Sequence, residues 1–244
     1  MQAALCRTGG SVLDMRRSQV EIEADAEGIL NWFDAVIPSL IKNCECKYGQ
    51  SPRGIGVGFG GIVERDTGII DHSVHVKGWE RLPLKARLER QFGIPAIVEN
   101  DTVCGGYAEY RLGAGKGAKG FFYTNIGSGI GGAIFIDGKP VLGQSLGAAY
   151  FGQTCVPDWN KVGETERIEN LCSGFAIERR LQTSGYVPCD SAMFTLTNGK
   201  TENMDCRLLG QCSFTEDAVP IGAMLFAEKR VKRIQITTIN NNKF

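Results

Sequence analysis

The spacing of apolar residues predicts helices that alternate with short strands. In residues 23–43, apolar side chains recur every three or four positions from Ile29 to Ile41. This period predicts an amphipathic helix, with a kink at Pro38. The same period predicts a second helix over 82–92, which ends at a glycine. A third helix is expected over 102–112.

Compact apolar runs bounded by glycine or proline predict the strands. Residues 1–22 are expected to form a β-hairpin that turns at Thr8–Ser11. In 53–63 glycines alternate with apolar residues. Glycine weakens a strand, so these positions are expected to admit a close neighbour or a ligand. Further strands are expected at 69–70, 96–98, 121–126 and 133–136.

The second half of the chain has a weaker pattern. We expect a loop over 143–160, helix over 164–182 with a break at Ser173-Gly174, and a last helix over 218–233. Residues 183–214 are polar, without a clear period. The segment 234–244 resembles nothing else in the chain, and it is interpreted either as a solvated tail or as the product of a shifted reading frame.

Composition restricts the classes of function. The 244 residues include 43% hydrophobic and 22% charged residues, and Lys+Arg and Asp+Glu both number 27. Such a neutral chain argues against a nucleic-acid or anionic-membrane surface as its main partner. No apolar run approaches the ~20 residues of a membrane span, and the first residues lack the order of a signal peptide. The expected location is the cytoplasm.

The cysteines and histidines do not form a metal motif. Nine cysteines are scattered without a C-x-x-C pair, and there are only two histidines. Zinc sites need close thiolate and imidazole spacing, so no zinc is expected. Reduced, mostly buried thiols are the preferred interpretation.

A glycine-rich stretch, Gly127-Ser128-Gly129-Ile130-Gly131-Gly132, joins two of the predicted strands. Successive backbone N–H groups in such a turn can bind phosphate. A dinucleotide fingerprint would require a helix after Gly132, whereas a strand and the turn Asp137-Gly138 follow here. A phosphate-gripping hairpin and an ordinary tight hairpin both remain open.

Polar residues end the predicted strand at 96–98. Asn100 and Asp101 follow this strand and precede a helix. In open α/β sheets, ligands bind at the carboxyl ends of strands. The alternative is that Asn100 or Asp101 only caps the helix.

Several of these stretches together resemble the ROK family of repressors, open reading frames and sugar kinases. Order and spacing agree over roughly 1–182. The matching stretches are Gly54–Gly58, Thr67–Ile70, Gly78-Trp79, Pro95–Asp101, Arg111–Gly117, Gly127–Gly132, Gly147–Val156 and Cys172–Arg180. The resemblance implies a two-lobed α/β actin-like ATPase (ribonuclease H-like) sugar kinase fold, incomplete in this chain. The expected lobes are 1–115, lacking its first strand, and 116–233, with 234–244 as an atypical tail.

The resemblance also implies roles for individual residues. Asp101 matches the catalytic base and Asn100 a sugar-hydroxyl ligand, while Gly127, Ser128, Gly129, Gly131 and Gly132 would bind the phosphates of ATP with Mg²⁺. His75, Tyr150 and Gln153 stand at sugar-contacting positions. His75 could hydrogen-bond a sugar or be an ordinary surface histidine. The substrate would be a hexose or N-acylhexosamine, and a homodimer is usual in the family.

The sequence departs from the family at three places. The opening Asp-x-Gly-Gly-Thr strand is absent, so the chain is expected to begin one strand later. Tyr150-Phe151-Gly152-Gln153 replaces Glu-x-Gly-His, and the zinc cysteines are missing. The C-terminal segment that completes the adenosine pocket is replaced. A lost phosphate loop removes contacts worth about 3–4 kcal/mol each.

Two functions are therefore carried forward. The first is an ATP-dependent hexose kinase, which requires Asp101 and the hairpin near Gly129 to face one crevice. The second is a sugar-binding or regulatory relative without turnover, which the changes at Tyr150 and Gln153 favour. A DNA-binding repressor is disfavoured, because residues before 23 offer no helix-turn-helix.

Overall fold

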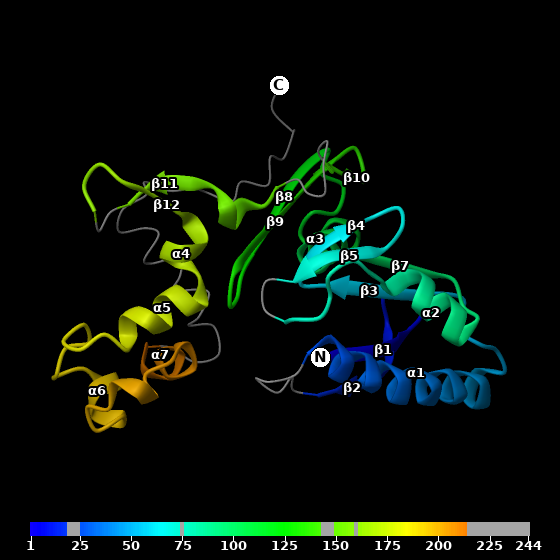
Figure 1. Ribbon diagram of the computed structural model, residues 1–244, viewed down its shortest axis with the longest axis horizontal. Coiled ribbons are helices and arrows are strands. Elements are labelled where there is room, and N and C mark those ends of the chain that lie inside the picture. Colours follow the sequence, from blue (N-terminus) through cyan, green and yellow to red (C-terminus); the bar gives the residue numbers. More distant parts are fainter. Residues whose placement is uncertain (19–24, 74–75, 143–148, 159–160, 214–244) are drawn as a thin grey trace. The chain divides into compact units, whose positions relative to one another are not determined.

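The structure, a computed structural model, describes residues 1–18, 25–73, 76–142, 149–158 and 161–213 (Figure 1). These residues form two compact units. Of the described residues, unit 1 comprises those in 1–117 together with Leu142, and unit 2 comprises 118–141 together with those from 149 onward. Because His75, the helix expected over 218–233 and the tail 234–244 lie outside the described residues, the structure does not test them.

The described part of unit 1 forms three small sheets and three helices. Its elements, in order, are β1 (Gln2–Cys6), β2 (Val12–Arg17), α1 (Ala26–Tyr48), β3 (Ile55–Phe59), β4 (Gly61–Glu64), β5 (Ile69–Ser73), β6 (Leu82–Pro83), α2 (Leu84–Phe92), β7 (Ala96–Asn100) and α3 (Asp101–Leu112). The sheets are the antiparallel hairpin β1–β2, the parallel pair β3–β7 and the antiparallel β4–β5–β6. The hairpin confirms the strands expected in 1–22.

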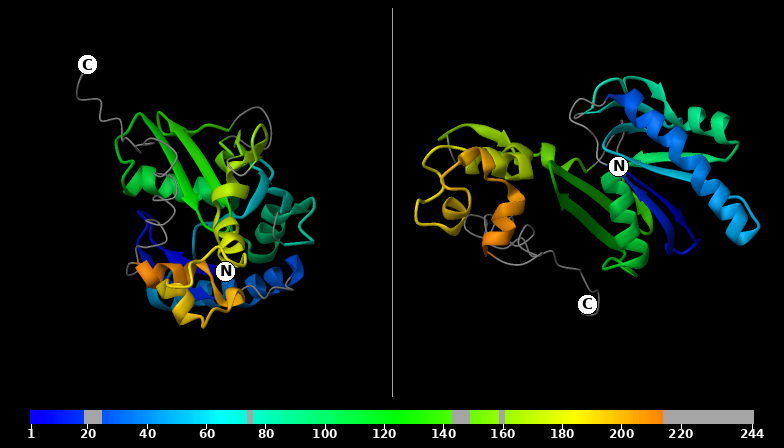
Figure 2. Two further views of the ribbon diagram at one scale, coloured as in Figure 1. Left: turned by 90° about the vertical axis from the view of Figure 1, so that its left-hand side faces the viewer. Right: turned by 90° about the horizontal axis from the view of Figure 1, so that it is seen from below.

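The long helix α1 begins and ends at clear sequence signals. Asp25 caps it by accepting the N–H of Gly28, and Gly49 ends it with a left-handed φ of 66°. The helix extends to Tyr48, beyond the expected end at residue 43, because the stop signal is Gly49 and not the last apolar residue. Pro38 lies inside the helix. As Figure 2 shows, α1 runs beside the β1–β2 hairpin.

The core of unit 1 lies between the β3–β7 pair and the helices α1 and α2. Leu84, Leu88 and Val98 are fully buried there. Trp79 contacts Phe59 edge to face, with 4.9 Å between ring centroids. Arg87 of α2 also donates to Asp34 of α1 at 2.7 Å. This packing fixes β3 and β7 side by side, with Phe59 in register with Asn100.

Unit 2 is built on a long antiparallel hairpin followed by short helices. Its elements are β8 (Gly120–Ile126), β9 (Ile130–Ile136), β10 (Lys139–Pro140), η1 (Phe151–Gln153), β11 (Cys155–Pro157), β12 (Thr165–Arg167), α4 (Ile168–Cys172), α5 (Gly174–Leu181), α6 (Ala192–Leu196), η2 (Thr201–Asn203) and α7 (Cys206–Ser213). The β8–β9 register runs from Gly120↔Ile136 to Ile126↔Ile130. This register confirms the strand–glycine loop–strand prediction.

Several predictions for unit 2 need correction. The loop expected over 143–160 contains η1 and strand β11, and the helix expected from residue 164 begins as strand β12. The break at Ser173 is confirmed, because it separates α4 from α5. The stretch 183–214 holds α6, η2 and α7, and apolar side chains of α6 and α7 pack with those of α5 around Met193 and Met204. These helices are too short to show a period in the sequence.

Candidate active site

The first cluster of site residues lies at the carboxyl ends of β3 and β7 in unit 1. Parallel strands end at the same edge of a sheet, so Gly60, which follows β3, and Asp101, which follows β7, come together there. A Cβ atom built on Gly60 would lie 3.4 Å from Asp101 Oδ2. A Cβ at position 60 would therefore touch the carboxylate at van der Waals distance.

Asn100 caps helix α3 and also ties it to β4. Its Oδ1 accepts the N–H groups of Thr102 and Val103 at 3.0 and 3.2 Å, and its Nδ2 donates to the carbonyl of Gly61 at 3.1 Å. Asn100 is therefore the N-cap residue of α3. A side-chain amide carries two N–H donors. Among the described residues, one hydrogen bond from this amide is found, the one to the Gly61 carbonyl.

Asp101 is exposed at the first position of α3. Its Oδ1 accepts the N–H of Thr102 at 2.7 Å and lies 3.3 Å from the hydroxyl of the same residue. No hydrogen bond from the described residues reaches Oδ2. The helix N-terminus favours an anionic group at this position. One oxygen is therefore held in place while the other remains open to a proton donor.

An ion pair and a thiol lie directly behind this carboxylate. Arg65 Nε lies 2.8 Å from Glu99 Oε2 and forms an ion pair with it. The N–H of Arg65 is not aligned for a hydrogen bond to this oxygen. A Cβ atom built on Gly58 would lie 3.5 Å from Cys104 Sγ. Burial, followed by the charges of Glu99 and Asp101, raises the pKa of the Cys104 thiol to about 11. Cys104 is therefore a neutral thiol at pH 7.

The second cluster surrounds the tip of the β8–β9 hairpin in unit 2. Gly174 and Phe175, the first residues of α5, donate their N–H groups to the carbonyls of Gly127 and Ser128 at 2.8 and 3.3 Å. A Cβ atom on Gly174 would lie 2.6 Å from the Gly127 oxygen, so only glycine allows this approach. The start of α5 therefore holds the carbonyl side of the tip.

Glu169 of α4 also contacts the tip. Its Oε2 accepts the N–H of Ile130 at 2.8 Å, and its Oε1 accepts Gln153 Nε2 at 3.2 Å. The Gly127 N–H bonds to the Gly129 carbonyl at 2.9 Å. Among the described residues no hydrogen bond involves the N–H of Ser128 or Gly129. These two amides are the candidate phosphate donors.

The glycines of the tip fall into two kinds. A Cβ on Gly132 would lie 2.5 Å from the Ala149 carbonyl oxygen, so packing requires glycine there, whereas a Cβ on Gly129 would lie 2.5 Å from the end of the flexible Glu169 side chain, which can shift. A Cβ on Gly127 would meet nothing within 4 Å. Gly131 lies opposite Asn125 in the strand ladder. Packing therefore gives no reason for glycine at position 127.

The predicted site residues are divided between the two units. Asn100 and Asp101 lie in unit 1, whereas Ser128, Gln153 and the exposed Tyr150 lie in unit 2. Sequence reasoning missed Glu169, Arg65 and Cys104. Glu169 could have been found from its position five residues before the predicted glycine break, but no spacing rule links Arg65 to Glu99.

Among the described residues, no group of three His, Cys, Asp or Glu side chains could hold a metal ion, and no helix is long and apolar enough to cross a membrane.

The similarity of this chain to known proteins identifies its family. The sequence profile described as ROK family matches residues 1–239. This chain belongs to the ROK family. Members of known structure that it resembles include sugar kinases of the actin-like ATPase fold, which confirms the predicted fold class.

The similar proteins include both kinases and a regulator. Glucokinase from Halalkalibacterium halodurans is 37% identical over 130 residues, which cover 52% of this chain and 39% of that protein. The xylose repressor of Caldicellulosiruptor bescii is 28% identical over 175 residues, which cover 70% of this chain and 42% of that protein. A ROK family glucokinase from Streptomyces griseus, solved in complex with glucose and AMPPNP, has a TM-score of 0.70 and 26% identity, with coverage of 91% of this chain and 70% of that one. The chain thus spans about two fifths of the length of the curated relatives.

Proposed function

We propose that this ROK chain is part of a sugar kinase that transfers the γ-phosphoryl group of ATP to a hydroxyl of a hexose or N-acylhexosamine. The observation that carries the proposal is the carboxylate of Asp101. It lies at the carboxyl end of β7 with one oxygen anchored to Thr102 and the other beside a glycine. A similar ROK glucokinase was solved with glucose and AMPPNP, which supports this substrate pair.

The proposed role of Asp101 is that of general base. Its Oδ2 would accept the proton of the sugar hydroxyl as that oxygen attacks the γ-phosphorus. The bond from the γ-phosphorus to the bridging oxygen breaks, and ADP leaves. General-base assistance contributes about 10²–10⁴-fold to rate. The second N–H of the Asn100 amide would hydrogen-bond a sugar hydroxyl nearby.

The hairpin tip would contribute to phosphate binding. The amides of Ser128 and Gly129 are suited to an anion, and Gly127 leaves open space beside them. Mg²⁺ supplied with ATP neutralises phosphate charge when it is bound. Positioned donors and cations carry most of the stabilisation in phosphoryl transfer.

A second candidate function is sugar binding without turnover. The observation that favours it is Glu169, whose carboxylate accepts the Ile130 amide and lies beside Gly129. A negative charge at this position opposes a phosphate on the neighbouring amides. The similarity to a xylose repressor, 28% identical over 70% of this chain, is compatible with a regulatory role.

Two measurements on the full chain separate the candidates. ADP release is followed with a panel of hexoses and N-acetylhexosamines, and binding of each sugar and of an ATP analogue is titrated calorimetrically. Sugar-dependent ADP release supports the kinase. Sugar binding without ADP release assigns the chain to the second function, and the absence of both sugar binding and turnover contradicts both.

A further inference from the structure

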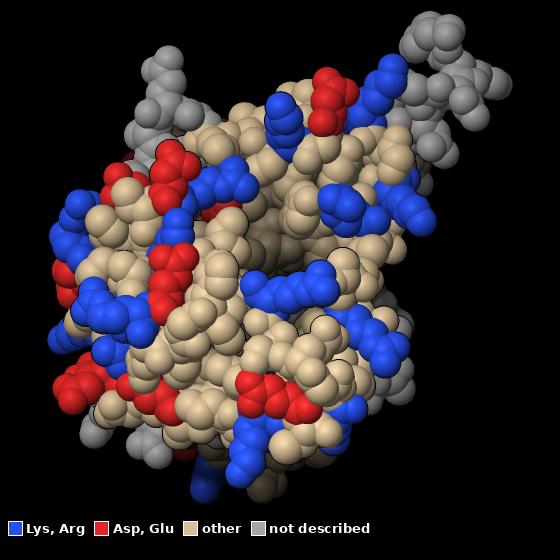
Figure 3. All heavy atoms as spheres, turned by 90° about the vertical axis from the view of Figure 1, so that its right-hand side faces the viewer, with Lys and Arg blue, Asp and Glu red and all other residues tan. Residues whose placement is uncertain are grey.

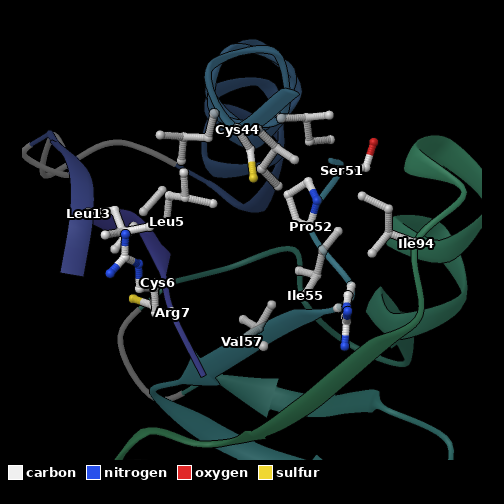
Figure 4. Close-up of a pocket in the computed structure, with 18 of the residues that line it drawn as sticks. Leu5, Cys6, Arg7, Leu13, Cys44, Ser51, Pro52, Ile55, Val57 and Ile94 are labelled. Atoms are coloured by element: carbon white, nitrogen blue, oxygen red, sulfur yellow. The ribbon is translucent and has the colours of Figure 1, made fainter. Parts of the chain in front are cut away.

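Strand β3 separates an apolar groove from the charged surroundings of Asp101. Ile55 and Val57 point into the groove, which has a volume of about 1100 Å³ and lies below α1 in Figure 4. Successive side chains of a strand point to opposite faces, so position 58 faces the other way. A Cβ atom built on Gly58 would lie 3.5 Å from both Asp101 Cα and Cys104 Sγ. The candidate base therefore lies on the face of β3 opposite the groove.

Glu99 lies on this second face and holds the end of β7. It is in register with Gly58 of β3, and its Oε1 accepts the N–H of Asn100 at 3.0 Å. Its Oε2 lies 2.8 Å from Nε of Arg65. Each oxygen of Glu99 thus contacts one group, and the side chain links Arg65 to the residue that precedes the base.

Arg65 lies in the turn that follows β4. Among the described residues, β4 belongs to a sheet with β5 and β6, and β7 pairs only with β3. Side chains connect β4 to β7 instead: Asn100 Nδ2 donates to the carbonyl of Gly61 at the start of β4, and Arg65, beyond its end, pairs with Glu99. Gly60, which lies beside the candidate base, directly precedes β4. Two consecutive residues of β7 therefore fasten both ends of β4.

The Arg65–Glu99 pair differs from an exposed ion pair. On the face of the molecule shown in Figure 3, acidic and basic side chains are interspersed. Exposed pairs add little to stability, because water and salt screen them. The Glu99 side chain, by contrast, is only 15% exposed, and its Oε2 atom is buried without a hydrogen bond from the described residues. A buried carboxylate depends on its counter-charge, which Arg65 supplies.

The same pair sets the charge around Asp101. Burial, followed by the charges of Glu99 and Asp101, raises the pKa of the Cys104 thiol to about 11, and the charge of Arg65 opposes this shift. The two carboxylates and the guanidinium therefore act within one small region. Carboxylates that lie close together disfavour each other's ionised form. Without Arg65, the charge of Glu99 would act on Asp101 unopposed.

We propose that Arg65 is a positioning residue, which acts through Glu99 to hold Asn100 and Asp101 in place for the sugar. The inference rests on the proposed function of those two residues. Arg65 need not touch the sugar, since its effect passes through the Glu99 carboxylate to the N–H of Asn100. A displaced base lowers the rate more than the affinity, because the reaction requires aligned atoms.

The test compares three variants of the full chain: Arg65→Met, the double variant Arg65→Met/Glu99→Gln, and Arg16→Met. The last removes an exposed ion pair with Asp14 in the same unit and is the control. We expect Arg65→Met to lower kcat for sugar-dependent ADP release at least about tenfold and to change KM for the sugar less than about threefold. Arg16→Met should change neither constant.

The pH profile separates positioning from a general loss of stability. Arg65→Met leaves the Glu99 charge unpaired and should move the acid limb of kcat/KM to higher pH by at least about half a unit. The double variant carries neither charge, so its acid limb should return to the original pH and its kcat should exceed that of Arg65→Met. A double variant that matches Arg65→Met in both respects overturns the inference.

Hydrogen exchange gives a readout that does not depend on turnover. In Arg65→Met the N–H of Asn100 should exchange at least about fivefold faster than in the unchanged chain. The N–H of Ala176, bonded to Ser173 in unit 2, should exchange at the original rate. An unchanged chain without ADP release refutes the proposed kinase, and this measurement then decides the inference alone. Equal exchange of Asn100 in both proteins overturns the inference, as does an Arg65→Met enzyme with the original kcat.

Discussion

Two carboxylates in the candidate site differ in the partners of their oxygens. Asp101 uses Oδ1 for its own helix, and Oδ2 faces the Gly60 side. Glu169 uses both oxygens, one for Ile130 and one for Gln153. A proton acceptor needs an accessible oxygen, whereas a residue that organises a loop needs its oxygens engaged. By this geometry Asp101 is suited to accept a proton, and Glu169 is suited to hold the hairpin tip in place.

The first prediction at the residue scale concerns this support. Glu169→Ala should lower the free energy of unfolding by about 1–3 kcal/mol, because the partly buried Ile130 N–H loses its acceptor. Glu169→Gln retains an acceptor oxygen and should cost less. The exposed pair Lys161–Glu164 supplies the control, since Glu164→Ala should cost under about 1 kcal/mol. Urea unfolding measures all three, and equal losses for Glu169→Ala and Glu164→Ala would contradict the supporting role.

The second prediction concerns the thiol behind Asp101. Burial and the neighbouring carboxylates raise the pKa of Cys104 from 9.0 to about 11. Between pH 9 and 11 the unfolded chain loses this proton while the folded chain keeps it, so stability falls as pH rises through this window. The loss amounts to at most about 2–3 kcal/mol.

The variant Cys104→Ser does not titrate there and isolates this effect. Its free energy of unfolding in urea should fall less steeply from pH 9 to 11 than that of the unchanged chain. Other groups that titrate in this range, Cys206 among them, are present in both proteins and cancel in the comparison. Identical slopes would show that Cys104 is not held neutral by its surroundings.

At the scale of elements, the hairpin tip is built by two helices that differ in what they supply. Helix α5 gives its first N–H groups to the tip carbonyls, and α4 gives a carboxylate to a tip amide. The first N–H groups of any helix lack partners within the helix. The tip and the start of α5 therefore satisfy each other, and among the described residues no hydrogen bond uses the remaining tip amides, those of Ser128 and Gly129.

The third prediction compares two glycines in this contact. Gly174→Ala should lower the free energy of unfolding by about 1–3 kcal/mol, because its Cβ would approach the Gly127 carbonyl at 2.6 Å. Gly127→Ala meets no atom within 4 Å and should cost under about 0.5 kcal/mol. If the tip binds phosphate, Gly127→Ala should instead weaken binding of an ATP analogue. Urea unfolding and calorimetry measure the two effects, and the reverse order of stabilities would contradict the contact.

Elements with local signals could be predicted from the sequence. The β1–β2 and β8–β9 hairpins carry glycine turns between apolar runs, and the amphipathic period of α1 is long enough to be recognised. The helices α6 and α7 could not be predicted, because each spans at most eight residues and depends on contacts with α5. The capping role of Asn100 follows from its residue type, but its bond to the Gly61 carbonyl joins residues 39 positions apart. Such long-range partners leave no local pattern.

At the scale of the whole molecule, the chain is a ROK protein whose proposed chemistry uses residues from two compact units. Asp101 and Asn100 belong to the first unit, and Ser128 and Gly129 to the second. The resemblance to the family indicated both sets from the sequence. Phosphoryl transfer needs a base at the sugar and donors at the phosphates, and the structure describes each set within its own unit.

The most direct test of this account is the rate of sugar-dependent ADP release by three full-length proteins: the unchanged chain, Asp101→Asn and Asp66→Asn. Asp66 is an exposed carboxylate of a turn in the same unit and serves as the matched control. The account predicts that Asp101→Asn lowers the rate at least about 100-fold, with sugar affinity little changed, while Asp66→Asn retains the original rate. An Asp101→Asn protein as fast as the unchanged chain, or an unchanged chain that releases no ADP with any sugar, would contradict it.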